Sequence, residues 1–333
     1  MRSLRSFAAK FGVNGTKRIR ICPKIGMAAL RKKWRVGLVA VLGLAAIGAL
    51  LYASRTQEPS FQGRKLGEWL ADIANTRDDR EAEPASNAVR QIGTNAIPYL
   101  LGMMRAKDSK LKETFNTLLA KAHINRIRIP NASDKHSRAF LGFWALGPQA
   151  SSAIPELKAL MSNPKIVFTA ARALVEIGPA GVEAAVSGLA NTNAIVRRET
   201  AGVLGFPGIV RFTTNATPAR MAVLRAQAEF AVPPLIRALN DSDELTRARA
   251  ATALGLLGQK AEIVVPALIR NLAETNGWRV PASAAHGLGR FGTNAVPALP
   301  ALKGIAGHQD SRVRESAATA IQSIETQAEP RLE

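Results

Sequence analysis

Four basic side chains recur at one spacing along the chain and could together bind an anionic ligand. Each follows a proline by three or four residues: Lys158, Arg237, Arg270 and Lys303. Ammonium and guanidinium groups held in a row attract carboxylates and phosphates, and this attraction weakens as salt is added. The competing interpretation is a solvated helix face, because cations near a helix C-terminus are favoured by the helix dipole.

The remaining reactive residue types form no catalytic or metal-binding pattern. The histidines are dispersed and none is followed by Glu: His123, His136, His286 and His308. The sequence has no Gly-x-Ser-x-Gly, no His-Glu-x-x-His and no phosphate-binding loop. The single cysteine, Cys22, precedes a long apolar run, so the chain beyond that run has no cysteine nucleophile. We therefore expect a protein that is not an enzyme and that needs no cofactor or metal.

The elements that must position the four cations are helical hairpins. An Ala-rich segment ending in Gly, followed by a short turn and a Pro, recurs along the chain, as in residues 250–258 with Pro266 and 284–292 with Pro297. Gly permits a left-handed helix end, and Pro suits the first turn of the next helix. One hairpin cannot bury its apolar face alone, whereas stacked neighbours can. The sequence predicts an all-α fold, a right-handed α-solenoid of about six hairpins with essentially no strand.

These repeats resemble the HEAT-repeat family, and in particular the short bacterial form similar to the repeats of phycobilisome lyases. The resemblance covers about residues 80–325 and is strengthened by three Asp/Asn-x-x-x-Arg pairs: Asn193 with Arg197, Asp243 with Arg247, and Asp310 with Arg314. In that family such residues form a hydrogen-bonded ladder between repeats, so the resemblance implies a structural role for them. The unit ending at Gly292 departs from the pattern, because it has Gly277 and Pro281 at these positions.

The resemblance also implies where a partner would bind and which enzymatic activities are to be considered. In such solenoids the second helices line the concave groove, which would place the four cations there. Deoxyhypusine hydroxylase is built from similar repeats but is recognised by His-Glu pairs, which this chain lacks. Phycobilin lyases share the repeat type, although nothing in this sequence specifies a bilin pocket.

An uncharged run of 18 residues, beginning at Val36 and ending at Ala53, is long enough to cross a bilayer. The first 35 residues contain eleven Lys or Arg and no Asp or Glu, which predicts that the N-terminus stays in the cytoplasm. We expect a retained single-pass anchor in the inner (cytoplasmic) membrane, with the repeats in the periplasmic or extracellular space. Cleavage of the anchor and a start at Met27 both remain open.

The predicted organisation has five parts. They are a basic cytoplasmic tail (1–33), a transmembrane signal anchor (34–54), a juxtamembrane linker and capping helix (55–79), the HEAT-like solenoid (80–326) and a C-terminal tail (327–333). The capping helix is expected to start at Leu66 and to present an apolar face of Leu66, Trp69, Leu70 and Ile73. The alternative for this helix is a position on the membrane surface.

Together these features predict a membrane-tethered scaffold that binds a protein or an anionic envelope polymer on its concave face, without catalysis of its own. One alternative is a lyase-like or enzyme-accessory HEAT protein. A second is a nucleic-acid-binding HEAT-like protein, which the basic stripe would allow in the cytoplasm. The outward orientation of the repeats argues against nucleic acid.

Overall fold

The computed structural model describes residues 58–76, 79–108, 131–205 and 227–328, together with Lys110, Thr114 and Thr117. These residues belong to one compact unit, Thr56–Glu333. The predicted anchor from Val36 to Ala53 lies outside the described residues. The same holds for most of two segments, 108–135 and 209–229, where the spacing of the repeats in the sequence predicts insertions. None of the helices that the structure describes has both the length and the apolarity needed to cross a bilayer.

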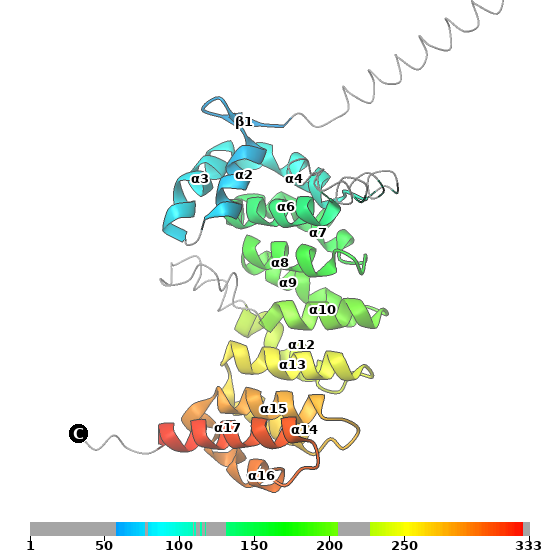
Figure 1. Ribbon diagram of the computed structural model, residues 1–333, viewed down its shortest axis with the longest axis vertical. Helices are drawn as coiled ribbons and strands as arrows, with labels where there is room; N and C mark the ends of the chain where they lie inside the picture. The colour runs from blue at the N-terminus through cyan, green and yellow to red at the C-terminus, as the bar shows by residue number, and fades with distance from the viewer. Residues whose placement is uncertain are drawn as a thin grey trace, which may run out of the picture. The chain divides into compact units, whose positions relative to one another are not determined.

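The described helices form a stack of hairpins, in which the first helix of each hairpin packs against the first helix of the next. Figure 1 shows these first helices as successive levels of the stack. They are α3 (Asp79–Ile92), α6 (Ala132–Leu146), α8 (Val167–Ile177), α10 (Ala194–Gly205), α13 (Glu244–Leu257), α15 (Arg279–Gly289) and α17 (Ser311–Ala328), the last of which has no second helix among the described residues.

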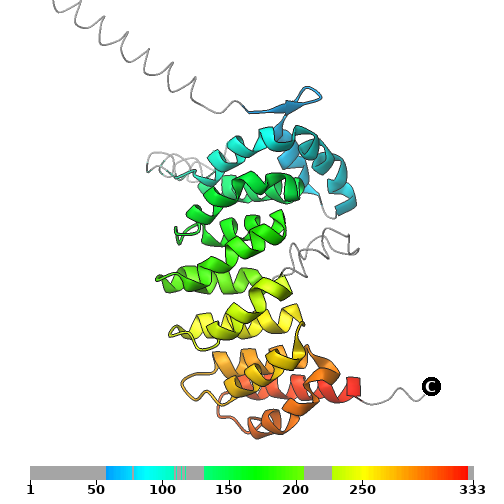
Figure 2. The same cartoon turned by 180° about the vertical axis from the view of Figure 1, so that it is seen from behind.

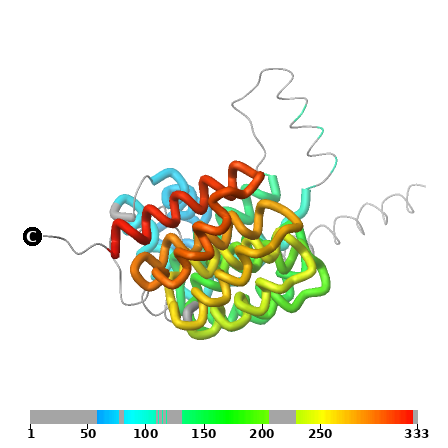
Figure 3. The backbone as a smooth tube through the Cα atoms, turned by 90° about the horizontal axis from the view of Figure 1, so that it is seen from below, coloured from blue at the N-terminus to red at the C-terminus, as the bar shows by residue number. Residues whose placement is uncertain are grey.

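The second helices form a second layer, visible from behind in Figure 2. This second layer consists of α4 (Ile97–Met104), α7 (Ile154–Leu160), α9 (Pro179–Val186), α12 (Val232–Ala238), α14 (Ala261–Leu272) and α16 (Leu299–Gly304). Short helical turns connect or extend these helices: η1 (Gly93–Ala96), η2 (Gly147–Ala153), η3 (Ser187–Ala190), η5 (Gln227–Ala231) and η6 (Gly292–Ala298). Figure 3 shows the same stack from below, with α17 in red. The prediction of a solenoid-like stack of helical repeats is confirmed.

The N-terminal end of the stack is covered by α2 (Leu66–Asn75), which contacts α3 (Asp79–Ile92) and α6. The apolar face expected for this helix is present, because Leu66, Leu70 and Ile73 are all buried. Trp69 is half-buried, and the guanidinium carbon of Arg64 lies 3.9 Å from the centre of its ring. The helix therefore covers apolar surface of the first repeats.

A small antiparallel hairpin precedes α2, made of β1 (Ser60–Phe61) and β2 (Arg64–Lys65). The sequence predicted essentially no strand, and this short hairpin was not expected. Its two-residue turn, Gln62 and Gly63, has φ values of 50° and 76°, the positive values that tight hairpin turns require.

Glycines end several first helices as the repeat pattern predicts. Gly147 is the C-cap of α6 with φ 52°, and Gly258 is the C-cap of α13 with φ 58°. Proline behaves as predicted in α7 and α12 but not in α14, where Pro266 lies inside the helix. The helix starts earlier than expected because Lys260, with φ 53°, turns the chain into it. Pro266 therefore removes one hydrogen bond from the middle of α14.

Close packing of small residues joins consecutive levels of the first layer. A Cβ atom placed on Gly255 of α13 would lie 2.4 Å from the Cα atom of Gly287 in α15. A Cβ on Gly205 of α10 would lie 2.3 Å from the Cα of Ala253 in α13. Leucines from both layers fill the core between the layers, and Leu235, Leu254 and Leu268 are fully buried. The backbone of the second layer is thus fixed against a tightly packed first layer.

Candidate functional site

The four predicted cations all lie on exposed positions of the second layer. Lys158 belongs to α7, Arg237 to α12, Arg270 to α14 and Lys303 to α16. The intervening helix α9 interrupts the row, because Glu183 is the exposed residue four positions after Pro179. The predicted stripe is therefore not continuous from α7 to α16.

Among the residues that the structure describes, three of these cations form no ion pair, Lys158, Arg237 and Arg270, and only the last two lie on second-layer helices that contact each other. The Nζ of Lys303 lies 3.0 Å from a carboxylate oxygen of Glu325 on α17, so its charge is compensated. Arg237 and Arg270 form no ion pair with any of the residues that the structure describes. They belong to α12 and α14, which contact each other.

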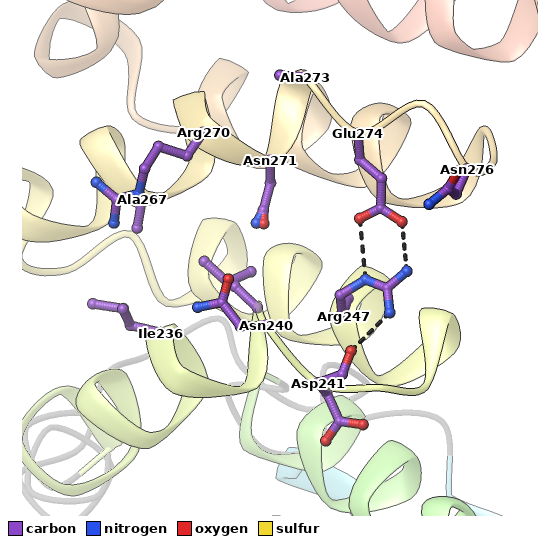
Figure 4. A pocket seen from close by; sticks show the side chains of 11 residues that line it. Ile236, Asn240, Asp241, Arg247, Ala267, Arg270, Asn271, Ala273, Glu274 and Asn276 are labelled. Carbon is purple, nitrogen blue, oxygen red and sulfur yellow. Dashed lines mark hydrogen bonds and ion pairs between the residues drawn. The ribbon is translucent and has the colours of Figure 1, made fainter.

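A pocket of about 550 Å³ opens between α12 and α14 (Figure 4). Its lining combines an apolar part with amide and charged side chains. The apolar residues are Ile236, Leu239, Ala267 and Ala273, and the polar ones are Asn240, Asp241, Arg247, Arg270, Asn271, Glu274 and Asn276.

One wall of this pocket is a network of compensated charges. The Nε of Arg247 donates to Glu274 at 3.0 Å, and its Nη1 donates to the carbonyl of Asp241 at 2.7 Å. The carboxylate of Asp241 accepts two hydrogen bonds from Arg197 of the preceding repeat, at 2.7 and 2.8 Å. These bonds hold the pKa of Asp241 below its usual value, and the bond to Glu274 raises the pKa of Arg247. Arg270 is therefore the cation of the lining whose charge remains available.

The predicted ladder residues are arranged differently from the sequence pairs. Arg197, Arg247 and Arg314 each donate from Nη1 to the carbonyls five and six residues earlier. Across repeats, Arg197 binds Asp241 and Arg247 binds Glu274. Asn193, Asp243 and Asp310 are thus not the acceptors of the arginines paired with them in sequence.

The Asn and Asp residues of those pairs instead organise the turns that start the helices. Asn193 accepts from the N–H of Ile195, and Asp310 binds Arg312. Asp243 is the N-cap of α13 and accepts from the N–H of Thr246 at 2.8 Å. Asp243 also bridges repeats, through Arg198 of α10 at 2.9 Å. Sequence reasoning missed the ion pair between Arg198 and Asp243. The two adjacent arginines of α10, Arg197 and Arg198, were a signal for it.

Replacing Asp243 by Asn is expected to lower the free energy of unfolding at pH 7 by about 1–2 kcal/mol. Bonds from Arg198 and Thr246 lower the pKa of Asp243 to about 2, against about 3.9 for an unfolded chain. A depressed folded-state pKa stabilises the protein above the unfolded pKa, and this contribution disappears as pH falls from about 4 to about 2. Asn can retain the N-cap hydrogen bond to Thr246, whereas the charge and one of the oxygens that accept from Arg198 are lost. Urea unfolding of both proteins across this pH range should show the difference shrinking, and a constant difference would contradict the assignment.

Asn271 is the residue of the pocket that sequence reasoning missed. It is 9 % exposed, and its Oδ1 has no hydrogen-bond partner among the described residues. Figure 4 shows its side chain pointing from α14 toward the Asn240 side of the pocket. A buried polar atom left without a partner costs about 1–3 kcal/mol, so such atoms call for an explanation.

The histidines do not converge in the part of the chain that the structure describes. His136 is buried in α6 with its Nε2 3.0 Å from the carbonyl of Ala106, while His286 and His308 lie on α15 and in the turn before α17. His123 lies outside the described residues. Within the described ranges no three His, Cys, Asp or Glu residues are grouped as metal ligands.

Residues 215–289 and 232–322 match the sequence model of the HEAT repeats family. This part of the chain, which contains the pocket between α12 and α14, is thus similar to HEAT repeats. No curated protein matches the chain.

Among solved structures, the chain is similar to other helical-repeat proteins at low identity. A designed armadillo repeat protein in complex with the peptide (KR)4 is 15% identical, with a TM-score of 0.39 over 78% of this chain and 100% of that one. Human deoxyhypusine hydroxylase is 20% identical, with a TM-score of 0.29 over 78% and 95%. A phycocyanin lyase complex from Nostoc sp. is 17% identical, with a TM-score of 0.31 over 80% and 98%.

Proposed function

We propose that this protein is a membrane-tethered repeat scaffold that holds a protein partner or an anionic envelope polymer on its second layer, with no catalysis of its own. The observation that carries the proposal is the available charge of Arg270 at the pocket between α12 and α14. Arg237 on the neighbouring helix adds a second exposed cation to the same layer.

The chemistry of these side chains favours an acidic partner. A guanidinium binds a carboxylate through two parallel hydrogen bonds, which a compact ammonium cannot do. Exposed cations also speed the encounter with an anionic partner, an effect that declines with ionic strength. The other charged side chains of the pocket, Asp241, Arg247 and Glu274, already form ion pairs. The charge that remains at the pocket is therefore the positive charge of Arg270.

The tether is proposed from the sequence, on the charge-free run from Val36 to Ala53 and the cationic segment before it. A reporter enzyme that is active only outside the cytoplasm, fused after Glu333, is expected to be active in cells. The same fusion to a reporter that works only in the cytoplasm should be silent. Activity of the cytoplasmic reporter would contradict both the topology and the localisation in the inner membrane.

The binding proposal is tested by capture of partners from an envelope fraction by the full chain. We expect the double charge reversal Arg237→Glu and Arg270→Glu to reduce the captured partner at least tenfold and added salt to weaken capture by the wild type. The control reverses two exposed cations outside the second layer, Lys165 and Arg290, and should leave capture unchanged.

Equal capture by both double variants would contradict a role for the second layer. A metal or chromophore that co-purifies with the chain would favour the lyase-like alternative. Salt-sensitive binding of DNA would instead favour the nucleic-acid alternative.

A further inference from the structure

The amide of Asn271 is positioned for a ligand that the described residues do not supply. It occupies the last turn of α14, between Leu268 and Leu272, both of which are buried. Its Oδ1 is buried without a hydrogen bond, and its side chain points into the pocket (Figure 4). A buried acceptor at this position gains a hydrogen bond only when a donor enters the pocket.

This unpaired acceptor restricts the chemistry of the ligand. A carboxylate or a phosphate monoanion chiefly offers acceptors, which would leave Oδ1 without a partner. A peptide group carries one N–H and one C=O, which match the acceptor and the donors of a primary amide. Two further primary amides, Asn240 and Asn276, are exposed at the same pocket and offer the same match.

The neighbouring residue, Arg270, adds a requirement for negative charge. Its guanidinium is exposed at the pocket, whereas Arg247 is already bound by Glu274 and by the carbonyl of Asp241. An acidic side chain on the ligand would pair with Arg270. The apolar side chains Ile236, Leu239 and Ala267 provide the remaining contact surface.

We propose that the pocket between α12 and α14 binds an extended peptide segment, pairing a main-chain amide with Asn271 and an acidic side chain with Arg270. This assignment rests on the proposed binding function and specifies its partner as an acidic peptide segment of a protein. An anionic polymer without N–H or O–H donors would leave the Oδ1 of Asn271 unpaired. A polysaccharide does carry hydroxyl donors, and the peptide probes described below distinguish it from a peptide segment.

The test uses the full chain in mild detergent and a fluorescent probe peptide of alternating Glu and Ala. Asn271→Ala is expected to weaken binding of this probe at least tenfold. Arg270→Gln should weaken it by a similar factor, but should not change the weaker binding of a matched peptide of alternating Gln and Ala. The control Asn294→Ala, at an exposed position of η6, should bind like the wild type.

A backbone N-methylated version of the acidic probe tests the main-chain contact directly, because it lacks the N–H groups that Oδ1 would accept. It should bind the wild type at least tenfold more weakly, and Asn271→Ala should then add no further loss. Circular dichroism of each variant confirms that the fold is retained.

Two results would overturn this inference. One is equal affinity of the wild type and Asn271→Ala for the acidic probe, and the other is no binding of that probe by the wild type. In either case, capture of an envelope partner that still depends on Arg237 and Arg270 would leave the proposed scaffold function standing. Loss of that dependence as well would remove both.

Discussion

Replacing Leu254 by Ala is expected to lower the free energy of unfolding by about 2–5 kcal/mol. Leu254 is fully buried in α13, the helix that contacts α10 and α15 within its own layer and α12 in the second layer. Truncation removes buried methyl groups and leaves a cavity, because the surrounding helices cannot fully close on it. Urea unfolding of the full chain in mild detergent, followed by circular dichroism, measures the effect.

The control for this experiment is Ile263→Ala in α14, where the side chain is 44% exposed. An exposed position of this kind should change the unfolding free energy by less than about 0.5 kcal/mol. A cost below about 1 kcal/mol for Leu254→Ala would contradict the packing of α13 at the centre of the stack.

Replacing Gly255 by Ala is expected to destabilise the protein by about 1–3 kcal/mol. In an ordinary helix the same substitution stabilises, by up to about 1 kcal/mol, so the sign of the effect is diagnostic. Here the added methyl would lie 2.4 Å from the Cα and 3.0 Å from the carbonyl oxygen of Gly287 in α15. Since both contacts are with backbone, they can be relieved only by separating the two helices.

Gly304→Ala is the matched control, because Gly304 also lies in a helix but has nothing within 4 Å of the position of its Cβ. It should be neutral or slightly stabilising in the same unfolding measurement. A stabilising Gly255→Ala would show that α13 and α15 are not in close contact.

The helical stack could be predicted because the residues that mark the ends of its helices lie close together in sequence and recur in each unit. Alternation of Ala-rich segments, Gly and Pro marks helix ends in each unit independently of the others. The predictions of helix starts and of a strand-free fold failed where a local segment differs from the repeat pattern. Pro266 lies inside α14 because the left-handed Lys260 starts that helix early, and the turn at Gln62 and Gly63 forms a short hairpin.

The binding site was less predictable, because it depends on contacts between segments far apart in sequence. The four cations occupy equivalent positions, but the ion pair between Lys303 and Glu325 forms only when α16 packs against α17. Similarly, the acceptors of Arg197 and Arg247 come from the following repeat. Nothing in the local sequence distinguishes the unpaired amide of Asn271 from a solvated asparagine.

A partner that binds the second layer of the stack should crosslink to residues of that layer, and site-specific photo-crosslinking tests this binding most directly. A photoreactive residue replaces either Asn240, exposed at the pocket, or Phe168, which is 41% exposed on α8 in the first layer. With envelope fraction and the full chain, we predict a crosslinked product from position 240 that disappears on charge reversal of Arg237 and Arg270, and no such product from position 168. A product from position 168 alone would contradict the claim.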